Sequence, residues 1–200
     1  MLAGHADSQG IGGSGTSGEA VGLYGAAPMR PGISDEHYWC LQVAHAVAVA
    51  SRWRPRFLTV HATGGKAMLE AAAGAAAKET KVLAVTVLTS MDEKAATEVG
   101  WTAGVAPTVR GLSRLAQQAG LAGVVCSPHE AKNERVAWGQ DAEIVTPGVR
   151  PAGMPGNDQA RSKTPEEAIR EGSSRIVVGR PVLQAPHPEA VLDQILSAHS

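Results

Sequence analysis

The sequence predicts an α/β fold, a (β/α)₈ TIM barrel that is apparently incomplete because only strands four to eight are recognisable. From residue 57 onward, short apolar strands alternate with helical segments in five units of roughly thirty residues. No G-x-G-x-x-G opens a helix after the first strand, which disfavours a doubly wound dinucleotide-binding sheet. Polar groups and glycines instead follow several strands, at ends that converge on one face of a barrel.

The chain is predicted to consist of two unequal parts that meet at residues 40 and 41. Residues 1–25 contain eight glycines and no helical or strand period, so residues 1–40 are predicted to be an irregular or disordered segment unrelated to the rest. Residues 41–200 are predicted to be the C-terminal part of the barrel. This part opens with an Ala/Val-rich helix at 41–53, a β-branched strand at 56–63 and an alanine-rich helix at 66–79.

The remaining elements follow the same alternation. Residues 81–90 form a continuous apolar run, typical of a strand covered on both faces. The helix at 105–120 has apolar residues at helical spacing and stops at a glycine. The helix at 164–172 opens with a Thr cap, a Pro and acidic residues. Further strands are predicted at 122–128, 142–148 and 175–181, and further helices at 129–139 and 188–199.

The composition excludes several classes of function. The hydrophobic fraction is 44% and the charged fraction 18%, as in globular proteins. A net charge of −1 provides no long-range attraction for nucleic acid or an anionic membrane, so an anion site has to be local. Cys40 and Cys126 have no metal-ligand spacing, and no segment suits a membrane span or a secretory signal. A cytoplasmic protein without a metal site is predicted.

Two arginine-bearing loops are the strongest candidates for ligand binding. Arg150 follows the strand at 142–148, and Arg180 follows Gly179 after the last strand. Barrels often bind phosphate at the loops after their last two strands, where glycine allows close approach and arginine binds oxygens bidentately. The alternative for Arg180 is an ion pair at the rim. Gln159 ends a Gly/Pro-rich loop that could close over a ligand or simply connect two elements.

Thr89 and His61 carry less information. Thr89 ends its predicted strand and could contact a ligand or cap the next helix. His61 has no visible carboxylate or nucleophile partner, so a hydrogen-bonded structural role is favoured over that of a base.

Taken together, these strand-end motifs resemble the bacterial orotidine 5′-phosphate decarboxylases. The resemblance covers about residues 41–196 and rests on the ordered segments "LTVHATGG", "VLAVTVLTSMD", "GVVCSPHE", "IVTPGVRPAG", "NDQAR", "TPEEAIREGS" and "IVVGRP". It implies a (β/α)₈ barrel that dimerises through its active face. It also implies conversion of orotidine monophosphate to uridine monophosphate and carbon dioxide, in pyrimidine synthesis, without metal or organic cofactor.

The resemblance also implies substrate-binding roles for individual residues. Arg180 and the Gly179 backbone would bind the phosphate, and Gln159 would lie in a closing loop that reaches both phosphate and pyrimidine. The other matching positions are Arg150, Thr89 and Pro147, the last packing against the base.

No catalytic residue of the family is found. The family's Asp-x-Lys-x-x-Asp motif would precede about residue 43, where this chain reads "ISDEHYWCLQVAH", and no lysine occurs before Lys66. A positioned ammonium stabilises and protonates the carbanion left by decarboxylation, so its loss predicts impaired activity. The simplest account joins the family's C-terminal part to an unrelated N-terminus. Such a chain is expected to expose two sheet edges and an apolar interior, and to be unstable alone.

Two other functions stay open. One is a non-catalytic remnant that binds a nucleotide phosphate. The other is a different phosphate-handling barrel, such as an aldolase or epimerase, although neither a Schiff-base lysine nor a metal set is visible at the strand ends.

Overall fold

The five strands form one parallel sheet in which every strand lies beside its predecessor in the chain. The computed structural model describes residues 35–151 and 163–197. The strands are β1 (Phe57–His61), β2 (Lys81–Val85), β3 (Gly123–Val125), β4 (Glu143–Pro147) and β5 (Arg175–Val177). Their order is β1-β2-β3-β4-β5, all parallel. A doubly wound sheet reverses its order partway, whereas a barrel winds in one direction, so the predicted fold class is confirmed.

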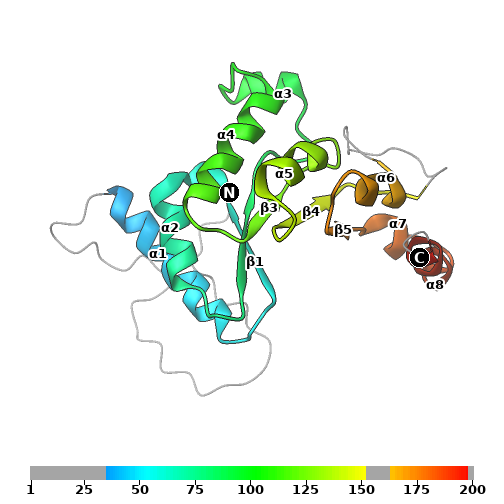
Figure 1. Cartoon of the computed structure of the whole chain (residues 1–200), viewed down its shortest axis with the longest axis horizontal. Coiled ribbons are helices and arrows are strands. Elements are labelled where there is room, and N and C mark those ends of the chain that lie inside the picture. Colours follow the sequence, from blue (N-terminus) through cyan, green and yellow to red (C-terminus); the bar gives the residue numbers. More distant parts are fainter. Residues whose placement is uncertain (1–34, 152–162, 198–200) are drawn as a thin grey trace, which may run out of the picture.

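Helices connect the strands, and several of them pack against one face of the sheet. They are α1 (Asp35–Ser51), α2 (Gly65–Ala75), α3 (Glu93–Glu98), α4 (Val105–Gln118), α5 (Ala131–Trp138), α6 (Pro165–Arg170), α7 (Arg180–Leu183) and α8 (Pro188–Ser197). A 3-10 turn, η1 (Ala62–Gly64), links β1 to α2. Figure 1 shows the strands through the middle of the molecule, with α1 and α2 beside β1 and with α7 and α8 beyond β5.

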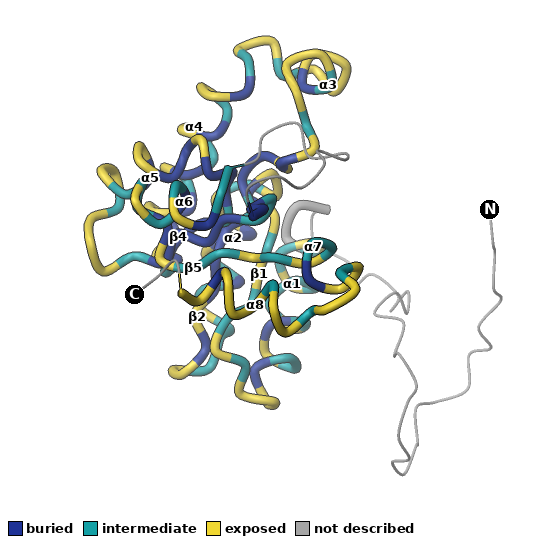
Figure 2. Tube along the Cα trace, turned by 90° about the vertical axis from the view of Figure 1, so that its right-hand side faces the viewer, coloured by how far each residue is buried: buried dark blue, intermediate teal, exposed yellow. Residues whose placement is uncertain are grey.

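The main core lies between the sheet and its helices. Alternate strand residues such as Val82, Ala84 and Ile144 pack in one cluster with Leu69 and Ala72 of α2. This alternation follows from the pleat, which sends successive side chains to opposite faces. Figure 2 shows that burial concentrates around the sheet and the inner sides of the helices, whereas α3 and α8 are largely exposed.

The sheet is strongly curved. The guanidinium of Arg175 in β5 lies 5.0 Å from the ring centre of Phe57 in β1, although these are the first and last strands. In a flat sheet, four strand spacings would separate them by about 19 Å. Two side chains that reach across this face can meet only if the two edges bend toward each other, as strands do in a barrel wall.

An ion cluster occupies the concave face at the amino ends of the strands. Glu143 of β4 accepts hydrogen bonds from Lys81 of β2 at 2.9 Å and from Arg175 of β5 at 3.1 Å. The Glu143 side chain is 8% exposed. The expectation of an apolar interior is therefore wrong at this end. In the described residues, the outer edges of β1 and β5 have no strand partner, as expected.

Several element boundaries differ from the sequence prediction. The strand predicted at 81–90 ends at Val85, and the one predicted at 175–181 ends at Val177, because the chain turns away to begin α7. Helix α1 begins at Asp35 rather than at residue 41, and the short α3 was not predicted. None of the helices described is both long and apolar enough to cross a membrane.

Candidate functional site

The loop after β4 brings Arg150 to the carboxyl end of the sheet. Gly148 has φ 77°, a left-handed conformation that favours glycine, and it turns the chain directly after Pro147. Val149 is buried and forms a parallel β-bridge with Lys163. The Arg150 N–H donates to the Lys163 carbonyl at 3.0 Å. The backbone of Val149 and Arg150 is thus paired with that of Lys163, and the whole Arg150 residue is 9% exposed.

The loop after β5 brings Arg180 to the same end. Gly179 precedes the four-residue helix α7, and its carbonyl accepts hydrogen bonds from Val182 and Leu183, each at 3.0 Å. A β-carbon placed on Gly179 would meet no atom within 4 Å. The space above Gly179 is therefore open to a ligand. Pro181 lacks an N–H, so this short helix offers an anion few backbone donors.

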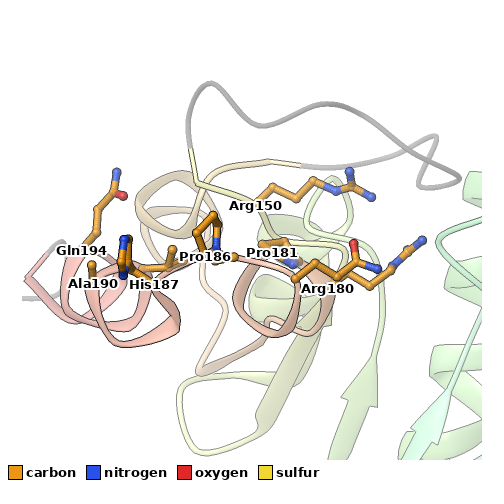
Figure 3. Close-up of a pocket in the computed structure, with 10 residues that line it drawn as sticks. Arg150, Arg180, Pro181, Pro186, His187, Ala190 and Gln194 are labelled. Carbon is orange, nitrogen blue, oxygen red and sulfur yellow. The ribbon is translucent and has the colours of Figure 1, made fainter.

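The two arginines line one cavity. Its volume is about 200 Å³, and the lining consists of Pro147, Gly148, Val149, Arg150, Val177, Gly179, Arg180 and Pro181. A neighbouring cavity of about 500 Å³ also includes both arginines and extends to Gln184, His187 and Gln194. In Figure 3 the Arg150 and Arg180 side chains extend to the same side, away from His187 and Gln194.

The lining is suited to a small anion. Among the described residues around the smaller cavity, two side chains are cationic and none is acidic. Two guanidinium groups from separate loops can bind different oxygens of one phosphate, each by charge-assisted hydrogen bonds. The described residues gather no group of three or more His, Cys, Asp and Glu side chains that could hold a metal ion.

The other predicted site residues do not join this cavity. Thr89 is buried in the turn that follows β2 and lines neither arginine cavity. Thr89 is not the cap of α3 either, because Asp92 accepts the hydrogen bond from Ala95 at 2.8 Å. Gln159 lies outside the described residues. Of the predicted site residues that the structure describes, the cavity therefore unites Pro147, Arg150, Gly179 and Arg180.

His61 and Lys81 lie away from the two arginines. His61 is exposed at the end of β1 and lines a separate hollow between α1 and the start of α2. Within the part of the chain described, its imidazole makes no hydrogen bond, so a hydrogen-bonded structural role finds no support there. Lys81 begins β2, at the opposite end of the strands, where Glu143 binds it.

Sequence reasoning missed the residues that α8 and the turn before it contribute. His187 and Gln194 line the larger cavity next to the arginines. The pattern of this helix indicates only an amphipathic element that covers the sheet, and nothing in it marks its polar residues as neighbours of Arg150.

Known proteins with similar sequences belong to one family. Residues 42–195 match the Orotidine 5′-phosphate decarboxylase / HUMPS family. The orotidine 5′-phosphate decarboxylase of Thermobifida fusca is 49% identical over 148 residues, which cover 74% of this chain and 63% of that protein. The one from Frankia casuarinae is 42% identical over 178 residues, which cover 89% and 65%. In a chain of 200 residues, the second match has to include part of the first forty.

A solved structure agrees with this. The crystal structure of the orotidine 5′-phosphate decarboxylase from Lactobacillus acidophilus superimposes with a TM-score of 0.67 at 34% identity, over 79% of this chain and 69% of that one. The chain spans less than two thirds of the length of the Thermobifida and Frankia relatives. Whether residues 1–40 are unrelated to the rest stays a prediction.

Proposed function

Because the chain belongs to the Orotidine 5′-phosphate decarboxylase / HUMPS family, we propose that it binds the phosphate of orotidine or uridine monophosphate with Arg150 and Arg180. The observation that carries this proposal is the shared cavity of about 200 Å³, in which two strand-end loops present one arginine each. A nucleoside lacks the phosphate oxygens that the two guanidinium groups would bind, so the phosphate is expected to supply much of the affinity.

The other proposed contacts with the substrate are those that the resemblance to the decarboxylase family implies. The Gly179 backbone would approach the phosphate, because no side chain fills the space above it. Pro147 would pack against the pyrimidine from the end of β4. Thr89 and Gln159 would also contact the substrate, as the family resemblance implies.

We also propose that decarboxylation by this chain alone is weak. Decarboxylation needs a positioned ammonium beside the carbanion, and no lysine precedes Lys66 in the sequence. Lys81 does not replace it, because Lys81 is bound to Glu143 at the amino end of β2 while the arginines lie at the carboxyl ends. Binding energy from the phosphate can survive the loss of the group that performs the chemistry.

Binding and turnover should be measured side by side. Calorimetric titration with uridine monophosphate and with uridine gives the contribution of the phosphate. Release of carbon dioxide from orotidine monophosphate gives the turnover. Binding without detectable release would establish the non-catalytic alternative, which the missing lysine favours. Turnover comparable to that of the full-length relatives would refute the proposed impairment.

Arg180→Ala tests the phosphate role. A hydrogen bond to a charged group contributes about 1.5–3 kcal/mol, so uridine monophosphate should bind about tenfold to a hundredfold more weakly while uridine is little affected. The matched control is Arg114→Ala, since Arg114 is exposed on α4 and lines neither arginine cavity. Equal losses for nucleotide and nucleoside would contradict the assignment of Arg180 to the phosphate.

We also propose a cellular location and a set of partners for the protein. Relatives named for this reaction support a cytoplasmic protein of pyrimidine synthesis whose partners are the nucleotide substrate and product. The family resemblance also implies a homodimer, without nucleic acid or membrane partners.

A further inference from the structure

We propose that the ion pair between Lys163 and Glu171 positions Arg150 for phosphate binding, so that both are positioning residues for the site. This inference rests on the proposed function, since it concerns the same cavity. It assigns a role to two residues that do not line that cavity.

The first link is the main chain of Lys163. Its carbonyl accepts the hydrogen bond from the Arg150 N–H at 3.0 Å, and its backbone pairs with Val149 in an isolated parallel bridge. A bridge of this size has no flanking ladder to support it, and a single such hydrogen bond contributes only about 1 kcal/mol. The backbone of Arg150 therefore depends on how firmly Lys163 is held.

The second link is the side chain of Lys163, which binds the carboxylate of Glu171. Both groups are largely shielded, with 19% and 28% of their side chains exposed, so water competes with the pair less than at an open surface.

The third link is the anchorage of Glu171 itself. It caps the C-terminus of α6, and its N–H donates to the Glu167 carbonyl at 3.0 Å. The other end of this helix is fixed by a capping box between Thr164 and Glu167. The Gly172 carbonyl, next in the chain, accepts a bond from Arg135 of α5 at 2.9 Å. Glu171 is thus held by a short helix tied at both ends.

These links form one path from α6 to the cavity. Glu171 fixes the Lys163 side chain, the Lys163 carbonyl fixes the Arg150 backbone, and the Arg150 side chain reaches the cavity that it shares with Arg180. Bidentate recognition of phosphate depends on position within a fraction of an ångström. A small displacement of Arg150 is therefore expected to weaken phosphate binding even though the same residues still line the cavity.

Glu171→Gln separates this proposal from simple electrostatics. It removes a negative charge, which would repel a phosphate, so charge alone would tighten the binding of uridine monophosphate or leave it unchanged. Loss of positioning predicts the opposite, a dissociation constant about tenfold higher for the nucleotide, with that of uridine unchanged. Lys163→Gln should have the same effect, whereas Lys163→Arg keeps the pair and should retain most of the affinity.

The matched control is Glu70→Gln, which breaks the exposed Lys66–Glu70 pair and should change neither ligand. Nucleotide affinity that is unchanged or higher in Glu171→Gln overturns the proposal. A second outcome also overturns the proposal. Glu171→Gln, Lys163→Gln and Lys163→Arg would all lose uridine binding or the near-ultraviolet circular dichroism signal to the same extent, which would show that the pair serves folding alone. Absence of nucleotide binding by the unaltered protein would instead refute the proposed function.

Discussion

Replacement of Glu143 by Gln tests the ion cluster that fills the amino end of the concave face. The variant keeps the shape of the side chain but removes its charge. Glu143 accepts hydrogen bonds from Lys81 at 2.9 Å, from Arg175 at 3.1 Å and from Ser174 at 3.4 Å. We expect a clear loss of stability, because two cations would remain around a neutral amide.

The size of the loss follows from exposure. Removing one partner of a buried pair costs about 3–5 kcal/mol when the charge left behind is buried as well. Here 44% of the Lys81 side chain and 39% of the Arg175 side chain are exposed, so both cations can be hydrated in the variant. We therefore expect a loss of about 2 kcal/mol, which lowers the melting temperature by about 4–8 °C in a domain of this size.

The pH dependence provides a second signature. Burial alone would raise the pKa of Glu143, but the hydrogen bond from Lys81 and the charge of Arg175 outweigh it and hold the pKa below the ordinary value of 4.5. Stability contributed by a carboxyl with a lowered pKa is present above pH 4.5 and is lost as the pH falls through the folded-state pKa. The difference between the protein and Glu143→Gln should be largest near neutral pH and should shrink in acid.

Urea unfolding followed by circular dichroism at several pH values measures both signatures. The control is Glu70→Gln, because the Lys66–Glu70 pair is 3.6 Å long and half exposed, and its loss should cost only a few tenths of a kcal/mol. A Glu143→Gln variant as stable as this control at pH 7 would refute the reasoning. A loss that does not diminish in acid would show that the lost stability does not come from the charge of the carboxylate.

Two further predictions concern buried positions outside the cavity. Gly123→Ala should destabilise the protein by about 3 kcal/mol or more, because the new β-carbon would lie 2.0 Å from the main-chain oxygen of Glu143. The control is Gly74→Ala on α2, where the new β-carbon meets open space and the free energy of unfolding should rise by about 0.5–1 kcal/mol. Urea unfolding checks both, and equal stability of the two variants would contradict the packing described. Burial raises the pKa of Glu134, and the Ser113 hydrogen bond only partly offsets this, so stability is full below pH 4.5 and falls as the pH rises through the folded-state pKa. Glu134→Gln should flatten this fall in melting temperature above pH 4.5, and a pH profile equal to that of the unaltered protein would contradict the raised pKa.

The sequence was informative wherever a short-range rule governs the outcome. Thr164, followed by Pro165 and acidic residues, predicted a capped helix, and the capping box is present. The convergence of Arg150 and Arg180 could also be predicted, because parallel strands place their carboxyl ends on one side of a sheet. Both inferences need only local chemistry and the direction of the strands.

The remaining features depend on register and on long-range pairing. Helix α3 is too short for a periodic pattern, and its only signal was the capping residue Asp92. Thr89 was placed at a strand end because the apolar run continues beyond Val85, where the strand stops. An apolar run records burial, and burial continues through the turn that follows β2. Burial and strand length are therefore separate properties at this position.

Side-chain partners were the least predictable feature. Glu143 begins its strand, where a charged residue is typical of a strand boundary exposed to solvent. Its partners come from two other strands: Arg175 lies in the adjacent strand β5, and Lys81 reaches it from β2, on the far side of β3. Lys163 and Glu171 are eight residues apart and flank the helix α6, so their pairing depends on the length and direction of that short helix.

The contact between Phe57 and Arg175 has a consequence for the order of folding. Every strand pairs with its neighbour in the chain, so the sheet can grow by closing one short loop after another. The contact across the concave face instead joins residues more than a hundred positions apart. We expect it to form only once the strands between them are in place, on the native side of the folding barrier. Interactions of this kind slow unfolding while leaving the folding rate almost unchanged.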